Sequence, residues 1–402
     1  MKKKILSLLL LFALVISMAA CGGDKKTNTG DVQSSDGAKD PIVIGCIGPL
    51  TGECAMFGNL LVETVQLLAE QTNEAGGING RPIEVKIYDN RDDAVETTNA
   101  ARKAIQQDGV CAFIGTDSSA TTIPLVGIAS ENKIPVVTSI ASNSKVTMTE
   151  DGKVRPYAFR ACLSDPQSGQ ILGQYAVTEC GYEKIAIIYD ISNDFSIGVT
   201  NELTKSVENS GGKVICAEAY NAGDVDYRAV LTKIKNAGDF DALYIAAPYY
   251  KQIGLIANQA RELGIDQNIL TTEGAMALDI FNIAGKSLEG AIFNCTVNHQ
   301  TDAVDWLRED FEARWGYDPA ENLGPDCYLA HDAFIILKSA IERAGSDDPE
   351  AIRDALETTT SIQGLTCMIT FDPATHLVYR EVPILKVVDN DFVQLGLFDI
   401  TP

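Results

Sequence analysis

The sequence predicts an α/β protein made of two doubly wound, Rossmann-like lobes of parallel sheet. From Pro41 onward, short apolar runs alternate with amphipathic segments, which is the pattern of strands and helices in sheets that helices cover on both faces. This rhythm breaks once, near residues 155–164, and restarts at about Pro166. The 402-residue chain is also longer than one hydrophobic core usually serves. Two lobes are therefore expected.

The first twenty residues have the layout of a secretory signal peptide. Lys2, Lys3 and Lys4 precede an apolar run over residues 5–16, and small residues lead to Cys21. Such a run is shorter than the roughly 20 residues of a membrane-spanning helix, and no later stretch approaches that length, so we expect a soluble, exported protein. The small residues before Cys21 resemble the lipobox of bacterial lipoproteins, with Met18 where Leu is more usual. We expect Cys21 to be acylated and to anchor the protein outside the cell membrane; the alternative is an ordinary signal peptide followed by a chance cysteine.

A polar segment over residues 22–40 follows Cys21. Its Gly, Ser, Thr, Asn, Asp, Gln and Lys residues bury too little apolar surface to order themselves, so we expect a flexible tether. The formal net charge is −23, and loss of residues 1–20, which carry three lysines and no acid, leaves −26. This acidity makes nucleic acid an unsuitable partner and says little about a small ligand.

The first lobe is expected to contain strands at residues 42–47, 83–88, 110–114 and 134–138, and the second at 184–189, 213–217, 242–246 and 268–271. The first helix shows an apolar stripe that should face the sheet, because Phe57, Leu61, Val65 and Leu68 recur at helical spacing. Gly76 and Gly77 then stop it.

The last hundred residues are expected to return to both lobes. Residues 301–356 read as mainly helical, and β-like runs follow at 366–371, 382–388 and 392–395. If this tail completes both sheets, the chain crosses between the lobes several times and makes a multi-strand hinge. The expected lobes are residues 41–160 with about 298–378, and residues 161–297 with about 379–402.

Motifs of catalysis and of cofactor binding are missing from the sequence. Gly45, Gly48 and Gly52 lack the spacing of a phosphate-binding loop, and residues 194–198 lack the leading glycine of a nucleophile elbow. The histidines, His299, His331 and His376, are too scattered in sequence to suggest a metal site. We therefore expect no catalytic residue, no cofactor and no metal.

The ten cysteines include nine besides Cys21, an odd number with no CxxC pair, and several lie in strand-like runs. Exported proteins often use disulfides, but a domain of this size does not need them. We expect mostly free, buried thiols, which would suit a reducing or anaerobic habitat.

Candidate ligand-binding residues follow the predicted strands, since ligands of open α/β sheets sit outside the carboxyl ends of the strands. Loops at 116–122 and 139–144 are rich in hydroxyl groups and could hold a carboxylate, although Ser and Thr also serve as helix caps. In the second half, Phe195, Tyr249 and Glu273 each follow a strand. A glutamate there could bind an ammonium group and the aromatic rings could wall a side chain, although Glu273 alone could be a solvated turn residue and Tyr249 a core residue.

Over residues 42 to about 395 the chain resembles the leucine/isoleucine/valine-binding protein family of branched-chain amino-acid ABC transporters, which has the type I periplasmic-binding-protein fold. No single motif is diagnostic, but their order and spacing are characteristic. The resemblance rests on Ile44-Gly45, Pro-Leu-Thr-Gly at 49–52, the run 73–80 ending in Ile-Asn-Gly, Phe113-Ile114-Gly115, the strand 185–190, the helix 259–264, Glu273-Gly274, His331-Asp332-Ala333 and Phe371-Asp372.

The resemblance implies which residues bind the ligand. The carboxylate would be held by Ser119, Ser142 and the amide of Ala141, and the ammonium by Glu273. Three aromatic residues would line the side-chain pocket: Phe57, Phe195 and Tyr249. These rings offer no formal charge, so an uncharged side chain is expected. Phe195 stands where a tyrosine is common, which could alter ligand choice, and Pro373 replaces a glycine-bearing turn.

The resemblance also implies a receptor with no chemistry of its own. Two lobes on a three-strand hinge would close on an amino acid, branched-chain or otherwise neutral, and the loaded monomer would dock on the permease of an ABC importer. Alternatives are a receptor for an amide or urea, and a sensor subunit for a membrane kinase or chemoreceptor. A hydrolase is disfavoured because no histidine accompanies Ser119 or Ser196 in a motif.

Overall fold

The computed structural model describes residues 40–52, 54–298, 301–319 and 326–399. The expected signal peptide, Cys21 with its expected acylation, and the expected tether apart from Asp40 lie outside these residues, as does His299. None of the helices in the described part of the chain has the length and apolar character needed to cross a membrane.

The first sheet contains only parallel strands, in the order β2-β1-β3-β4-β5. Four of them confirm the strands predicted in the first half of the chain. The fifth, β5, was missed, because it lies inside the segment interpreted as a break between lobes. The strands are β1 (Ile42–Gly48), β2 (Ile83–Asp89), β3 (Ala112–Gly115), β4 (Val136–Thr138) and β5 (Ala158–Arg160).

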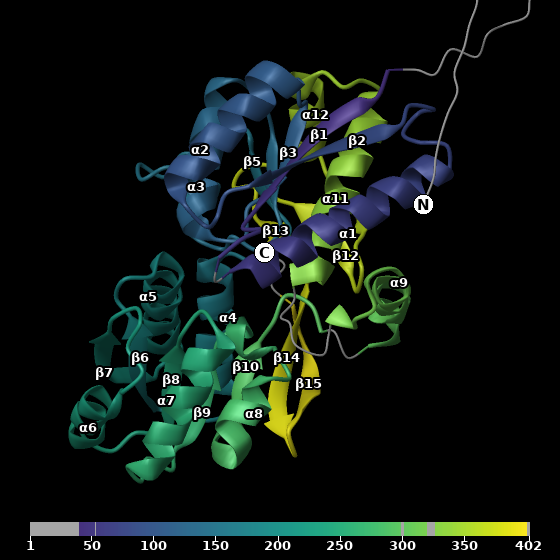
Figure 1. The fold of residues 1–402 in the computed structure, drawn as a ribbon. Coiled ribbons are helices and arrows are strands. Elements are labelled where there is room, and N and C mark those ends of the chain that lie inside the picture. Colours follow the sequence, from purple (N-terminus) through teal and green to yellow (C-terminus); the bar gives the residue numbers. More distant parts are fainter. Residues whose placement is uncertain (1–39, 53, 299–300, 320–325, 400–402) are drawn as a thin grey trace, which may run out of the picture. The chain divides into compact units, whose positions relative to one another are not determined.

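Helices cover both faces of the first sheet (Figure 1). On one face lie α2 (Ala94–Lys103), its continuation as a π-helical turn (Ala104–Asp108) and α3 (Ser119–Glu131). On the other lie α1 (Ala55–Glu74) and α11 (Asp326–Ala344), with α12 (Pro349–Glu357) against α11. The helix α9 (Asp305–Trp315) packs on α1 and α11. Residues far apart in the sequence thus complete one lobe.

The second sheet has the order β15-β14-β10-β9-β8-β6-β7. Strands β6 to β9 pair in parallel, as predicted, and β10 pairs in parallel with β9. In contrast, β14 runs antiparallel to both β10 and β15. The short β10 was not predicted. The strands are β6 (Lys184–Asp190), β7 (Lys213–Tyr220), β8 (Ala242–Ala246), β9 (Asn268–Thr271), β10 (Ile292–Asn294), β14 (Glu381–Val388) and β15 (Asp391–Asp399).

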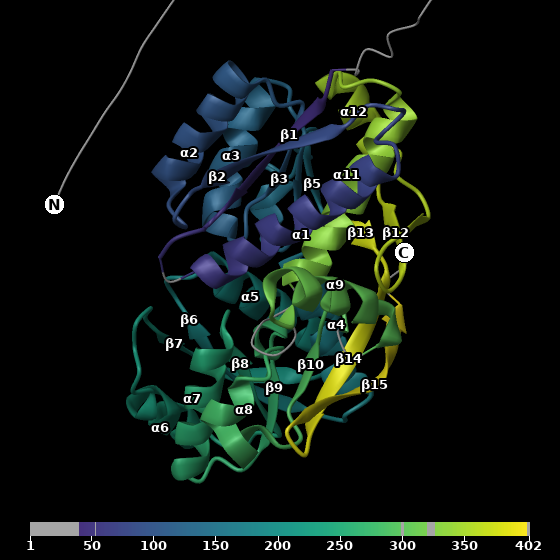
Figure 2. The same ribbon diagram turned by 45° about the vertical axis from the view of Figure 1, so that its right-hand side comes forward.

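Helices α4 (Asp165–Thr178) and α5 (Asp194–Asn209) cover one face of this second sheet (Figure 2). The other face is covered by α6 (Arg228–Asn236), α7 (Tyr250–Glu262) and α8 (Ile280–Ala284). Short 3-10 turns occur at Ser144–Val146, Glu273–Ala275, Gly285–Leu288 and Asp302–Val304. A small antiparallel sheet joins β11 (Ile362–Gln363), β12 (Met368–Phe371) and β13 (Val378–Tyr379).

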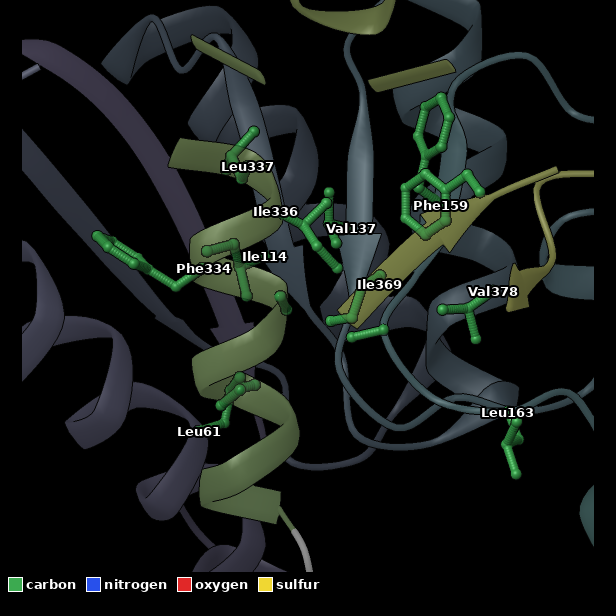
Figure 3. Packing of buried hydrophobic residues seen from close by; sticks show 14 of the residues in the cluster. Leu61, Ile114, Val137, Phe159, Leu163, Phe334, Ile336, Leu337, Ile369 and Val378 are labelled. Carbon is green, nitrogen blue, oxygen red and sulfur yellow. The ribbon is translucent and has the colours of Figure 1, made fainter. Parts of the chain in front are cut away.

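The largest apolar core runs through both halves of the molecule. In Figure 3, Ile336 of α11 points toward Val137 of β4, and Phe159 of β5 lies over β12 near Ile369. The same cluster continues through Leu163 into α4, α5 and the second sheet. Of the stripe predicted for the first helix, Leu61, Val65 and Leu68 belong to this core, whereas Phe57 does not.

The chain passes from one sheet to the other after β5, after β10 and after β13, and the three passages are bonded together. The Leu163 amide donates to Thr296 Oγ1 at 3.4 Å, and Arg380 Nη1 donates to the Ala161 carbonyl at 3.3 Å. Arg380 is buried and pairs with the equally buried Asp332 at 3.2 Å. This agrees with the predicted α/β fold of two doubly wound sheets joined by several strands.

Candidate functional site

A cavity of about 260 Å³ lies where strands of both sheets end. Its walls come from the segments that follow the carboxyl ends of β1 to β6, β8 and β9, together with the first turns of α1 and α11. This is the ligand position expected for open α/β sheets. The lining contains six of the seven residues predicted for the site: Phe57, Ser119, Ser142, Phe195, Tyr249 and Glu273.

The wall contributed by the first sheet contains the start of α3. Ser118 occupies the N-cap position but makes no capping hydrogen bond, so the first-turn amides are left for another acceptor. Ser119 is buried, and its hydroxyl accepts a hydrogen bond from the Asn143 amide at 3.2 Å. Helix starts with free amides stabilise anions, so this wall suits a carboxylate.

The loop that carries Ser142 is held by a buried arginine. Arg160 at the end of β5 donates to the carbonyls of Ala141, Ser142 and Asn143 at 3.2, 2.5 and 2.9 Å. The Ala141 amide, predicted to bind the ligand, instead donates to Thr138 Oγ1 at 3.3 Å, and Ala141 does not line the cavity. Sequence reasoning did not single out Arg160, because it lies in the segment interpreted as a break.

Glu273 begins the turn after β9, on the wall contributed by the second sheet. Its Oε1 accepts from the Thr296 amide at 2.5 Å and its Oε2 from the Thr296 hydroxyl at 3.0 Å. Burial raises the pKa of Glu273, and the bonds from Thr296 and the positive charge of Arg380 oppose that rise. Its neighbour Thr296 belongs to one of the three passages between the sheets. Glu273 is therefore an anchored acid at the cavity, and not a solvated turn residue.

An aromatic pair joins the two halves across the cavity. The rings of Phe57, at the start of α1, and Tyr249, at the start of α7, stack with centroids 5.7 Å apart. Phe57 thus belongs to the site and not to the sheet-facing stripe, since it precedes the buried part of the helix. Phe195 lines the same cavity from α5.

Four further carboxylates line the cavity, Asp194 at the start of α5 and three others, and sequence reasoning selected none of them for the site. Asp92 and Asp117 follow β2 and β3, and Asp326 is the first residue of α11. Asp92 is exposed and accepts from the Ser118 hydroxyl at 2.5 Å. Asp117 lay within a loop already selected for its hydroxyl groups, so its position after a strand was a usable signal. Asp326 offered none, because only the tertiary fold brings α11 to this place.

The two described histidines lie outside the cavity. His331 Nδ1 is 3.1 Å from Asp332, and His376 Nδ1 is 2.9 Å from the Ala158 carbonyl. Burial lowers the pKa of His376. Within the described ranges, no group of His, Cys, Asp and Glu side chains is arranged to hold a metal ion.

Comparisons with known proteins agree with this geometry. A family model described as periplasmic binding protein matches residues 41–391. The leucine-, isoleucine-, valine-, threonine- and alanine-binding protein of Pseudomonas aeruginosa is 30% identical over 324 residues, which are 80% of this chain and 84% of that protein. A solved leucine-binding protein from Thermotoga maritima is 29% identical with a TM-score of 0.78, and the match covers 89% of this chain and 99% of that one.

A branched-chain amino-acid transporter substrate-binding protein from Streptococcus pneumoniae, solved with isoleucine, is 25% identical with a TM-score of 0.75 and matches over 90% of this chain and all of that one (100%). Two doubly wound sheets with a cavity at their strand ends are the arrangement expected of a solute-binding protein of this class. The chain belongs to the periplasmic binding protein family, whose type I fold with two lobes it shares. This is a family of solute-binding proteins and not of enzymes.

Proposed function

We propose that this protein captures an amino acid outside the cytoplasm and delivers it to the permease of an ABC importer. The observation that supports this most is the gathering of six predicted residues from both sheets around one cavity. The start of α3, with Ser119 and Ser142, would bind the ligand carboxylate. Glu273 on the facing wall would bind the ammonium group. A zwitterionic head group fits between an uncapped helix start and an anchored carboxylate.

Binding would close the two lobes around the ligand. We take the first lobe as residues 41–160 with about 298–378, and the second as residues 161–297 with about 379–402. The three bonded passages between the sheets would serve as the hinge, and a ligand that touches both walls favours the closed state. The closed form of the monomer would then dock on the permease.

The names of the relatives make leucine, isoleucine and valine the reference ligands for a test. Thermal shift against the twenty amino acids, amides and urea identifies the class, because a ligand at 100 times its Kd stabilises by about 2.7 kcal/mol. We expect an α-amino acid to give the largest shift. The side chain it carries depends on the remaining groups of the cavity.

Glu273→Ala is the decisive variant. Removing one partner of a buried charge pair costs about 2 to 5 kcal/mol, or roughly thirtyfold to several thousandfold in Kd. Phe57→Ala should cost less, about 1 to 3 kcal/mol, because it removes apolar contact without stranding a charge. Calorimetric titration with the best ligand of the screen measures both, with Glu183→Ala, an exposed glutamate away from the cavity, as control.

If Glu273→Ala binds within about threefold of the parent, the ammonium role is wrong. An uncharged amide or urea then becomes the better ligand class. Neither contains a group that needs a carboxylate partner.

Cys21, outside the described residues, would carry the lipid that anchors the protein to the outer side of the membrane. Its place after small residues and before a polar segment motivates this. Cys21→Ala should give a protein that leaves the membrane fraction without detergent. An unmodified Cys21 in mass spectra of the membrane-extracted protein would contradict the anchor and leave the ligand proposal untouched.

A further inference from the structure

The cavity lining carries more negative charge than a neutral amino acid can balance. Five carboxylates line it, Asp92, Asp117, Asp194, Glu273 and Asp326, and none of its described lining residues is Lys, Arg or His. A neutral zwitterion brings one cation, which Glu273 would take, and adds a carboxylate of its own. The acids on the wall away from Glu273 are then left without a counter-charge.

Asp117 has the clearest need of a partner. Both of its carboxylate oxygens are enclosed by protein, and neither has a hydrogen-bond partner among the described residues. An ionised carboxylate in such a place is costly unless a cation joins it. Burial and the negative charges of Asp326 and Asp92 raise the pKa of Asp117 well above its usual range. The cavity therefore contains a carboxyl group that a cation would stabilise.

Asp326 supplies a second acid from another element. It is 4% exposed at the start of α11 and lines the cavity. Burial and the negative charge of Glu273 raise its pKa to about 7. Asp117 and Asp326 line the same cavity, and the negative charge of Asp326 contributes to the raised pKa of Asp117. A single cation between them would relieve both.

The stacked pair of Phe57 and Tyr249 lines the same cavity as these acids. Burial raises the pKa of Tyr249, and the negative charges of Asp92 and Asp117, which line the same cavity, add to that rise. The pair is stacked with centroids 5.7 Å apart. Aromatic faces attract ammonium and guanidinium groups, so rings beside unpaired carboxylates form a suitable pocket for a cation.

Resting on the proposed function, we infer that the ligand is a basic amino acid whose side-chain cation lies between Asp117 and Asp326, against Phe57 and Tyr249. Its α-ammonium group would lie at Glu273 and its carboxylate at the start of α3. The side chain is thus cationic and not uncharged, as the three aromatic residues alone had indicated. The aromatic rings keep a role, because they cover the methylene groups and face the cation.

The test uses pairs of amino acids that share a shape and differ in charge. Arginine is compared with citrulline, and lysine with norleucine, by calorimetric titration of the full protein, with leucine, isoleucine and valine alongside. We expect the charged member of at least one pair to bind at least about tenfold more tightly than its neutral partner and than any branched-chain amino acid. The inference is overturned if the neutral members bind as well as the charged ones, or if a branched-chain amino acid binds best.

Asp117→Asn and Asp326→Asn then locate the cation. Each should weaken binding of the charged ligand at least about tenfold and change binding of its neutral partner by no more than about threefold, while Asp239→Asn, at an exposed position outside the cavity, should change neither. Equal losses for both members of a pair would overturn the assignment to these acids. If a variant does not fold, the comparison of charged and neutral ligands on the parent protein still tests the inference.

Different results would contradict the proposed function and the inference about the ligand side chain. Glu273→Ala should abolish binding of charged and neutral members alike, because both carry the same α-ammonium group. If leucine binds best and requires Glu273, the proposed function stands and the inference about the side chain is wrong. If no amino acid of either class binds, the proposed function itself is wrong.

Discussion

Replacing Arg160 with methionine should disturb both stability and ligand binding, although Arg160 does not line the cavity. Arg160 is fully buried, and besides its three bonds to the loop carbonyls it donates to Thr147 Oγ1 at 3.0 Å. Methionine keeps much of the volume and removes the donors, which leaves buried carbonyls without a partner at about 1 to 3 kcal/mol each. Relaxation of the loop recovers part of this cost.

We expect Arg160→Met to lose about 3 to 5 kcal/mol in the free energy of unfolding, as is usual when one partner of a buried charged network is removed. At about 2 °C per kcal/mol for a large chain, the melting temperature would fall by roughly 6 to 10 °C. The same loop carries Ser142, and its Asn143 amide donates a hydrogen bond to the Ser119 hydroxyl. Affinity for the ligand should therefore fall about tenfold.

Scanning calorimetry and titration calorimetry measure the two effects on the same sample. Arg228→Met is the matched control, since Arg228 is exposed and its ion pairs among the described residues, with Asp226 and Glu262, lie on the surface. It should leave both quantities unchanged. If the free energy of unfolding of Arg160→Met lies within about 1 kcal/mol of the parent value and its Kd within about twofold, Arg160 does not position the loop.

Gly274→Ala should weaken ligand binding at least tenfold in calorimetric titration, because its Cβ would lie 2.3 Å from the Pro248 carbonyl and displace the segment before Tyr249. Gly396→Ala, which meets nothing within 4 Å, is its control, and equal affinities would contradict this geometry. Burial raises the pKa of Asp165 from 3.8 to about 7, so the unfolded state gains by ionising this carboxyl as the pH rises from about 4, and the folded state loses stability until about pH 7. Asp165→Asn should therefore stabilise by about 2 to 4 kcal/mol at pH 8 and little near pH 4 in urea titrations, and a pH-independent difference would refute the cause. All nine described cysteines are free thiols, so titration in denaturant without reductant should find nine besides Cys21, whereas four disulfides would overturn the expectation of a reducing habitat.

The positions of the strands could be predicted from the sequence to the extent that the strands are long and buried. Strands such as β1 and β6 read as continuous apolar runs between turn residues, and all eight strands assigned in this way are present. The short β5, β10, β11 and β13 carry too few residues to show a period. They are defined by the neighbours with which they pair, which no local pattern contains.

The site could be predicted in part for a similar reason. Residues after strand ends are brought together by the parallel sheet itself, so Ser119, Phe195, Tyr249 and Glu273 could be placed without coordinates. Asp326 could not, since it enters the cavity from a helix that packs on the opposite half of the chain. The net charge of a cavity depends on all the residues that line it, and the sequence around any one of these residues does not reveal that net charge.

The covering of the first sheet by α11 constrains when this protein can fold. Its strands and the helices α1 to α3 leave the ribosome early, yet the apolar face that Phe334, Ile336 and Leu337 cover stays open until residues 326–344 have been made. The second sheet likewise waits for β14 and β15. Domains usually fold as units, with the N-terminal one first during synthesis. Here neither sheet is complete until C-terminal residues have been synthesised, so apolar surface on both halves stays uncovered for most of translation.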